Sequence, residues 1–253
     1  MFGASLSLGW LEAVGLATVR MTAFLMIAPP FSYRAIPARV KAMLGIGLAL
    51  AVSPRVTPGY EPLDTGAFFT ALALELLVGA VLGFLVALIF SAVQSAGSLI
   101  DLFGGFQMAQ AFDPGSMVNG AQFTRLFQMT ALALMFASGA YQLVIGGIVR
   151  SYESIPLGGG LDLGVSAELM VTGVSQMLLA AVQIAGPLLV VLFLADAGLG
   201  LLTRVAPALN AFALSFPVKI LITLVLAGMV VTVLPEVIAA LTDEAFTTMR
   251  EVK

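Results

Sequence analysis

The stretch FFTALALELLVGAVLGFLVALIFSAV, which runs from Phe68 to Val93, decides the fold class of this chain. It is an apolar run with a single charged residue, Glu75, and it is longer than the roughly 20 residues that a helix needs to cross the hydrocarbon core of a bilayer. Its apolar character continues as far as Leu99. The stretch therefore predicts a long membrane-spanning helix.

Five further apolar runs flank this stretch. They are Leu6–Ala28, Ala42–Val52, Leu126–Val149, Leu169–Leu194 and Phe212–Val233. The run Ala42–Val52 is too short to span a bilayer as a full helix, whereas the others are long enough. Proline cannot continue a helix, so Pro29 and Pro235 are expected to end the first and the last run. The predicted fold is all-α: one domain of a polytopic integral membrane protein with five or six long helices.

The composition agrees with a membrane protein and excludes several classes of site. Hydrophobic residues make up 60% of the chain and charged residues 10%, against about 25% charged residues in a soluble domain. The chain contains no histidine and no cysteine, which excludes Ser-His-Asp and Cys-His catalysis, disulfides, and zinc sites built on imidazole or thiolate. We expect no cofactor and no metal. The net charge of −3, without a basic cluster, argues against a nucleic-acid partner.

The start of the chain lacks the positively charged region of a cleavable signal peptide, because its first basic residue is Arg20. We therefore expect the first apolar run to remain as a signal anchor.

Small residues recur at every fourth position of the long central run. They are Gly79, Gly83, Ala87, Ser91 and Ser95. Small side chains let two helix backbones approach closely, so this ladder predicts a helix-packing seam. The simpler interpretation is that small residues are common in membrane helices. Whether the seam faces a helix of this chain or of a partner stays open.

Several charged residues lie in or next to the apolar runs. They are Glu12, Arg20, Glu75, Asp101, Arg125, Asp196, Arg204 and Lys219. A charge that faces lipid at the bilayer centre costs about 3 kcal/mol or more, so each should face protein, water or a headgroup. Structural ion pairs or snorkelling are favoured for Glu12, Asp196 and Arg204, which lie near run ends. For Glu75 and Lys219, an ion or proton pathway stays open beside the structural interpretation.

A long connection, DLFGGFQMAQAFDPGSMVNGAQ, extends from Asp101 to Gln122. Connections in compact folds usually have about 4–6 residues, so this length is unusual. The segment is rich in glycine, methionine and phenylalanine, and flexible apolar side chains of this kind suit a deformable seal. The alternative is a re-entrant or buried connecting loop without a gating role.

Three stretches together resemble the FliR family of flagellar export proteins, which includes the T component of virulence-type III secretion systems. The stretches are RMTAFLMIAPPFSYRAIPARVK (20–41), the connection with its Phe-Asp-Pro at 112–114, and GLLTRVAPALNAFALSFPVK (200–219). Two residues depart from the family pattern, since Ala208 stands where glutamine is expected and Ala109 where glycine is expected. The residues that carry the structural motif are Arg20, Pro29, Pro37, Arg204, Pro207, Phe216, Pro217 and Lys219.

The resemblance implies a non-enzymatic subunit of an export gate in the bacterial inner membrane, at the flagellar basal body. Such a subunit assembles with FliP-like and FliQ-like subunits, an FlhB-like protein wraps the cytoplasmic entrance, and unfolded flagellar proteins pass through the channel. Its fold is one of long, kinked helical hairpins, with a FliP-like part at about 1–160 and a FliQ-like part at about 161–253. The resemblance also makes 106–120 a plug in the lumen, whose residues include Phe106, Met108, Phe112, Asp113, Pro114 and Met117.

Two other classes of protein remain as alternatives at this point. A stand-alone secondary transporter would use Glu75, Asp196 and Lys219 to carry protons or ions, but the two halves of the chain show no symmetric pair of broken helices. An intramembrane aspartyl protease would use two of Asp101, Asp113 and Asp196, although no supporting motif surrounds these aspartates.

Overall fold

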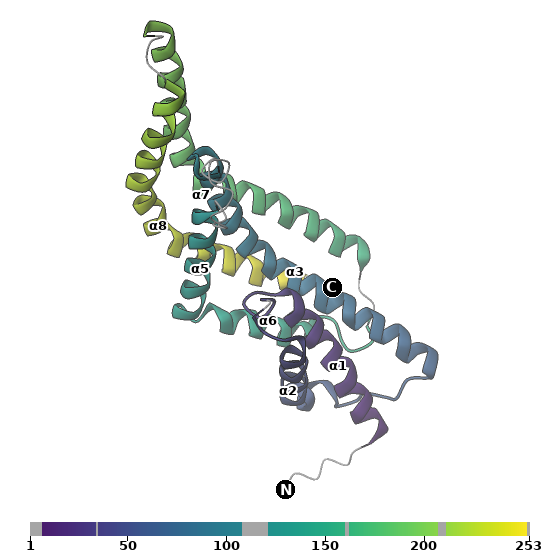
Figure 1. Cartoon of the computed structure of the whole chain (residues 1–253). Helices are drawn as coiled ribbons and strands as arrows, with labels where there is room; N and C mark the ends of the chain where they lie inside the picture. The colour runs from purple at the N-terminus through teal and green to yellow at the C-terminus, as the bar shows by residue number, and fades with distance from the viewer. Residues whose placement is uncertain (1–6, 34, 108–120, 160–161, 207–210, 252–253) are drawn as a thin grey trace. The chain divides into compact units, whose positions relative to one another are not determined.

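The computed structural model describes residues 7–33, 35–107, 121–159, 162–206 and 211–251, and its labelled elements are all α-helices (Figure 1). They are α1 (Leu8–Ile27), α2 (Ala38–Val56), α3 (Thr65–Phe103), α5 (Gln122–Ala137), α6 (Ala140–Ser154), α7 (Leu163–Val205) and α8 (Ala211–Glu251). The part of the chain that is described contains no β-strand. The prediction of an all-α fold is confirmed.

Four segments are long and apolar enough to cross a membrane: α1, α3, α7 and the part of α8 from Leu214 to Asp243. A fifth span results if α5 and α6 together count as one broken span. These segments confirm the prediction of a polytopic membrane protein.

The fourth apolar run is not one helix, which corrects the prediction of a continuous run from Leu126 to Val149. The helix stops at Ala137, and α6 starts after Gly139, whose φ of 75° lies in the left-handed region. Glycine adopts this conformation without the steric penalty of a Cβ atom, so it can separate the two helices.

The last two helices are longer than their apolar runs, and α8 passes through Pro235 to Glu251. The prediction that Pro235 ends the last run is therefore wrong. Proline is tolerated inside membrane helices when neighbouring groups satisfy the freed backbone carbonyl. α7 likewise passes through Pro187, and α3 extends to Phe103, so that residues 101–103 belong to a helix and not to the connection.

Two compact units divide the chain. The first comprises Met1–Leu88, Gly139–Val174 and Thr242–Lys253, and the second comprises Ile89–Ser138 and Ser175–Leu241. The predicted division near residue 160 into a FliP-like and a FliQ-like part stays a prediction.

The first unit contains α1, α2, α6, α3 as far as Leu88, the start of α7 and the end of α8. At the start of α1, the Ser7 hydroxyl accepts a hydrogen bond from the Trp10 N–H at 3.2 Å, a typical N-cap. At its end, the helix stops just before Pro29, as the sequence predicts. The core of this unit is built from side chains that are almost fully buried: Leu16, Met21, Phe24, Leu25, Val78, Leu82 and Ile148.

The second unit contains the end of α3, α5, and long segments of α7 and α8. Its buried side chains include Val93, Ile100, Phe127, Met135, Leu188, Leu192 and Leu234.

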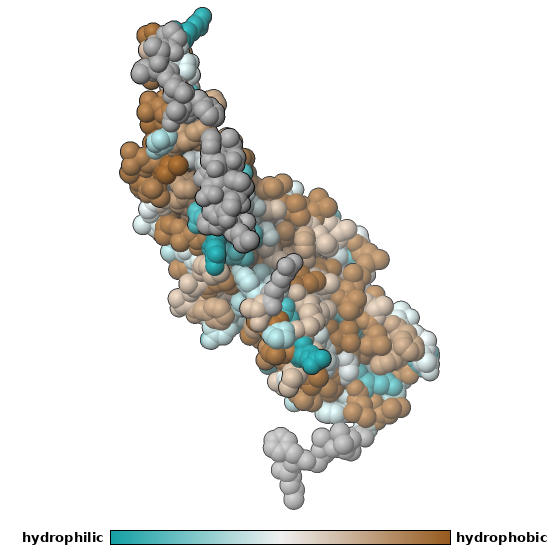
Figure 2. Space-filling view, viewed as in Figure 1, coloured by the Kyte–Doolittle hydropathy of each residue, from teal (hydrophilic) through white to brown (hydrophobic). Residues whose placement is uncertain are grey.

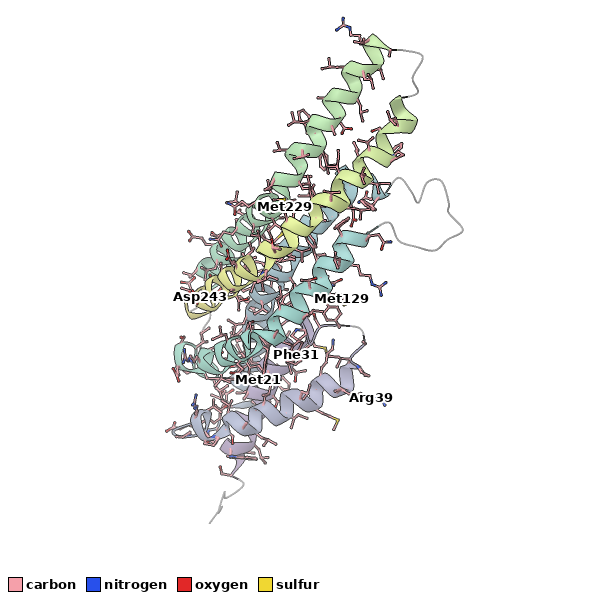
Figure 3. All side chains as sticks on the ribbon, turned by 90° about the vertical axis from the view of Figure 1, so that its left-hand side faces the viewer. Met21, Phe31, Arg39, Met129, Met229 and Asp243 are labelled. Atoms are coloured by element: carbon pink, nitrogen blue, oxygen red, sulfur yellow. The ribbon has the colours of Figure 1, made fainter. Side chains whose placement is uncertain are left out.

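Large apolar side chains also remain exposed on many of the helices. Figure 2 shows hydrophobic residues over much of one face of the molecule, and two of the residues that Figure 3 labels, Met21 and Met229, differ in burial. Met21 on α1 is fully buried, whereas Met229 on α8 is 68% exposed. The exposed set on α7 and α8 includes Phe193, Leu194, Leu201, Leu221, Val225 and Met229.

Candidate functional site

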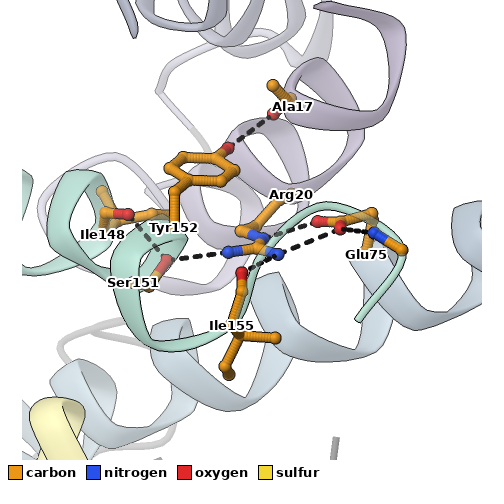
Figure 4. Close-up of polar contacts among 8 residues, drawn as sticks. Ala17, Arg20, Glu75, Ile148, Ser151, Tyr152 and Ile155 are labelled. Atoms are coloured by element: carbon orange, nitrogen blue, oxygen red, sulfur yellow. Dashed lines mark hydrogen bonds and ion pairs between the residues drawn. The ribbon is translucent and has the colours of Figure 1, made fainter. Parts of the chain in front are cut away.

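A buried polar site in the first unit surrounds Arg20, a fully buried residue of α1. Its Nε donates to Glu75 Oε2 at 2.5 Å, and its Nη2 donates to Glu75 Oε1 at 2.9 Å (Figure 4). Two parallel hydrogen bonds match the planar guanidinium to the carboxylate. Glu75 on α3 is itself 1% exposed, so the ion pair is shielded from solvent on both sides.

The remaining guanidinium donors point to α6 and the residue after it. Arg20 Nη1 donates to Ser151 Oγ at 3.1 Å, and Nη2 also donates to the carbonyl oxygen of Ile155 at 2.9 Å. On the other side of the pair, the Gly158 N–H donates to Glu75 Oε1 at 3.2 Å. A buried ion pair is tolerated only when such additional bonds satisfy its polar atoms. The site therefore joins α1, α3 and the end of α6.

Tyr152 covers one face of the guanidinium. Its ring centroid lies 4.2 Å from Arg20 Cζ, a distance at which a cation–π interaction is favourable (Figure 4). Its hydroxyl donates to the carbonyl oxygen of Ala17 at 3.1 Å. Tyr152 thus connects α6 to α1 through both its ring and its hydroxyl. We call Arg20, Glu75, Ser151, Tyr152 and Ile155 the Arg20 cluster.

Close packing of α1 and α3 brings the ion pair together. A Cβ atom on Gly79 would clash with the Arg20 carbonyl oxygen and lie 2.9 Å from Ala23 Cβ. A Cβ atom on Gly83 would lie 3.0 Å from the Phe24 carbonyl oxygen. The glycines of α3 therefore allow the two backbones to approach, as small residues do in membrane helices.

The other members of the predicted small-residue ladder lie elsewhere on α3. Ala87 and Ser91 are partly buried. Ser95 belongs to the second unit, where its hydroxyl lies 4.0 Å from Met177 Sδ on α7. The structure thus places the first two members against α1 and the last against α7.

In the second unit, α7 and α8 are joined by an ion pair between Asp196 Oδ1 and Lys219 Nζ, which lie 2.6 Å apart. The side chains are 43% and 15% exposed, respectively, so this pair is far less buried than the Arg20 pair. One turn further along α8, the fully buried Thr223 donates from its hydroxyl to the Lys219 carbonyl oxygen.

The second unit also places the predicted motif residue Phe216 next to the end of α3. A Cβ atom on Gly105 would lie 3.2 Å from the Phe216 ring, and a Cβ atom on Gly104 would lie 2.8 Å from Thr223 Oγ1. The start of the long connection is therefore adjacent to Phe216 and Thr223 of α8. The sequence alone gives no indication that the connection and Phe216 are adjacent.

The remaining motif residues have simpler positions. Pro29 is buried just after α1, and Pro37 directly precedes α2. Pro217 lies within α8, and Arg204 is exposed at the end of α7. Pro207 lies outside the described residues.

Of the predicted plug residues, only Phe106 lies in the described part of the chain. Its ring centroid is 5.2 Å from that of Phe123 on α5, in an edge-to-face arrangement. The other predicted plug residues, Met108, Phe112, Asp113, Pro114 and Met117, lie outside the described residues.

Comparison with known proteins decides the family. Residues 11–245 match the family described as "Bacterial export proteins, family 1". This chain belongs to that family. It is 30% identical to flagellar biosynthetic protein FliR of Escherichia coli (strain K12) over 250 residues, which cover 97% of this chain and 94% of the relative. The resemblance to the FliR family is confirmed.

Two further relatives show a similar degree of identity, and one of them has a different name. The chain is 30% identical to flagellar biosynthetic protein FliR of Bacillus subtilis (strain 168) over 240 residues, covering 93% of this chain and 92% of the relative. It is 32% identical to Yop proteins translocation protein T of Yersinia pestis over 176 residues, which cover 68% of this chain and 67% of the relative.

Membership of the export family does not favour the transporter alternative, and neither do the charged residues. Glu75 is bound by Arg20, and Asp196 by Lys219, so none of the three candidate carriers has a free charge. The aspartyl protease alternative has no support either, because Asp101 and Asp196 have different partners and Asp113 lies outside the described residues. Among the described residues, no three acidic side chains are grouped to hold a metal ion.

Proposed function

We propose that this chain is a core subunit of a flagellar type III protein export gate. The proposal rests on the match of nearly the whole chain to an export protein family, together with its similarity to FliR proteins and to a Yop translocation protein. In this role the chain has no enzymatic activity. It forms part of a channel in the bacterial inner membrane, at the flagellar basal body, through which unfolded flagellar proteins pass.

The partners that we propose are FliP-like and FliQ-like subunits and an FlhB-like protein. Exposed apolar surface supports an assembly. Of the most apolar 18-residue stretches of α7 and α8, only 33% and 17% are buried within the chain, so these helices need lipid or another subunit to cover them. Part of this surface would pack against the neighbouring subunits of the gate.

The Arg20 cluster would serve this assembly as a fixed framework. It joins α1, α3 and α6 through hydrogen bonds that use both oxygens of Glu75 and all three guanidinium nitrogens of Arg20. Because both charges are neutralised and desolvated, moving a proton through Glu75 would require the ion pair to break. A structural role therefore explains the cluster better than a transport role.

The connection between α3 and α5 would act as the plug of the channel. Support comes from its composition, since Phe106 to Gly120 is rich in phenylalanine, methionine and glycine. Such side chains can conform to a passing polypeptide while limiting ion leak. Deletion of Met108–Met117 in an assembled complex should increase ion leak or change export. A deletion that leaves both unchanged would remove the plug from the proposal.

Assembly tests the main proposal directly. The tagged chain is expressed alone and then together with its FliP-like and FliQ-like neighbours, and each preparation is measured by native mass spectrometry. A defined hetero-oligomer that contains this chain is expected. A stable monomer or homodimer that ignores those neighbours would contradict the proposal. Motility of a flagellated host that lacks its own FliR protein provides a second readout.

A further inference from the structure

A second buried polar site lies in the other unit, at the end of α3. Asp101 is fully buried there, and its carboxylate accepts three hydrogen bonds. Oδ1 accepts from the Phe123 N–H at 2.9 Å, and Oδ2 accepts from the Thr124 N–H at 2.9 Å and from the Thr124 hydroxyl at 2.7 Å. All three donors are in the first turn of α5.

The first turn of any helix contains N–H groups without a partner inside the helix. In α5, the residue at the N-cap position is Ala121, which has no side chain that could accept from them. Asp101 supplies the acceptor from a different helix, and its negative charge also suits the positive end of the α5 dipole. Asp101 therefore caps α5 across the connection of residues 104–121.

Backbone packing independently holds the same two helices together. A Cβ atom on Gly97 would lie 2.7 Å from both the Phe123 carbonyl oxygen and the Thr124 Cα. The Phe123 side chain is 4% exposed and packs edge-to-face against Phe106, at the start of the connection, and against Phe127. The start of the connection, at Phe106, thus contacts Phe123, in the first turn of α5 where the connection ends.

We propose that Asp101 is a positioning residue that fixes the start of α5 to the end of α3 and so holds both ends of the 104–121 connection at one point. We call this set of contacts, made by Asp101, Gly97, Phe123 and Thr124, the Asp101 clasp. Its importance for export rests on the proposed function, in which the connection is part of a channel. Its capping role is independent of that function, because it follows from the geometry of α3 and α5 alone.

Hydrogen–deuterium exchange in the assembled complex tests the capping role. In Asp101→Ala, the amides of Phe123 and Thr124 should exchange about tenfold faster or more, because each loses a hydrogen bond to a charged acceptor. Asp101→Asn should give a smaller increase, since its amide keeps one acceptor oxygen. Unchanged exchange at both amides in Asp101→Ala would overturn the proposal.

Asp64→Ala is the matched control. Asp64 is an exposed aspartate whose Oδ1 accepts from the N–H groups of Gly66 and Ala67 at 2.8 and 2.9 Å, so it caps α3 locally. Its substitution removes the same kind of cap without affecting the clasp, and exchange at Phe123 and Thr124 should stay at the wild-type rate. If Asp101→Ala does not fold, Asp101→Asn keeps the size of the side chain, and faster exchange at the Phe123 and Thr124 amides is still expected. Unchanged exchange in that variant would then overturn the proposal.

Ion leak and export in the same complexes test the functional half of the proposal. Asp101→Ala should change leak or export, whereas Asp64→Ala should change neither. Faster exchange with leak and export both unchanged would overturn the positioning role in the gate. Failure of the proposed function would look different, because the wild-type chain itself would then form no complex with its FliP-like and FliQ-like neighbours.

Discussion

Arg20 and Glu75 form a two-bond ion pair between α1 and α3 in which the side chains are 0% and 2% exposed. Removing one partner leaves the other as an uncompensated buried charge, which typically costs about 3–5 kcal/mol. We therefore expect Arg20→Met to lower the thermal stability of the purified complex strongly, and to reduce the amount of complex recovered. A small effect would mean that the pair is hydrated in the assembled protein.

The double variant Arg20→Met with Glu75→Leu separates the charge from the packing. Replacing both charges with apolar side chains avoids the uncompensated charge, so the double variant should be more stable than the sum of the single losses predicts. Asp196→Asn is a control for ion-pair loss at a less buried site. Because Asp196 is 43% exposed, its loss should cost about 1 kcal/mol or less.

Arg20→Lys tests whether the shape of the guanidinium matters in addition to its charge. A lysine ammonium can pair with Glu75, but it cannot donate in the same fixed directions to Ser151 Oγ and the Ile155 carbonyl. We expect Arg20→Lys to be clearly destabilised, although less than Arg20→Met. If the complex with Arg20→Lys melted at the wild-type temperature, only the charge of residue 20 would be required.

Tyr152 makes two separable contacts, which two substitutions can distinguish. Tyr152→Phe keeps the ring over Arg20 and loses the hydrogen bond to the Ala17 carbonyl, so it should cost about 1 kcal/mol. Tyr152→Leu also removes the cation–π contact and should cost more. Tyr141→Phe is the control, because the Tyr141 hydroxyl accepts from Gln142 at an exposed position. Equal melting temperatures for the two Tyr152 variants would exclude a contribution from the ring.

The sequence predicts the helical fold well because long apolar runs leave few other structures in a membrane. Two of its errors lie at positions where local residues are ambiguous. Ser138 and Gly139 interrupt an apolar run without any proline, and only the positive φ of Gly139 reveals the break. The prediction for Pro235 is wrong in the opposite direction, because the sequence predicts a helix end there and α8 continues through it.

The site is only partly predictable, for a different reason. The sequence identifies Arg20 and Glu75 individually as candidates, because a charge inside an apolar run needs a partner. Their pairing spans 55 residues of sequence, and no local spacing rule connects them. Ser151, Tyr152 and the Ile155 carbonyl were missed, because hydroxyls and backbone oxygens near the end of an apolar run have no distinctive pattern. The polar segment 150–154 is the one available signal.

The contact between Gly79 and α1 gives the most direct test of how the Arg20 cluster is assembled. A Cβ atom at position 79 would overlap the Arg20 backbone and approach Ala23 Cβ, so α1 would have to move away from α3. Overpacking of this kind typically costs about 1–3 kcal/mol, and here it would also stretch the bonds from Arg20 to Glu75. Gly79→Ala should therefore lower the melting temperature of the purified complex.

Gly15→Ala is the matched control for Gly79→Ala. Gly15 lies within α1, and a Cβ atom there would have nothing within 4 Å. Alanine is favoured over glycine inside a helix by roughly 0.5–1 kcal/mol, so Gly15→Ala should leave the melting temperature unchanged or raise it. The two variants make the same chemical change in neighbouring helices and differ in what the new methyl group meets. Opposite shifts would assign the loss in Gly79→Ala to the α1–α3 contact, whereas equal shifts would show that this contact does not limit stability.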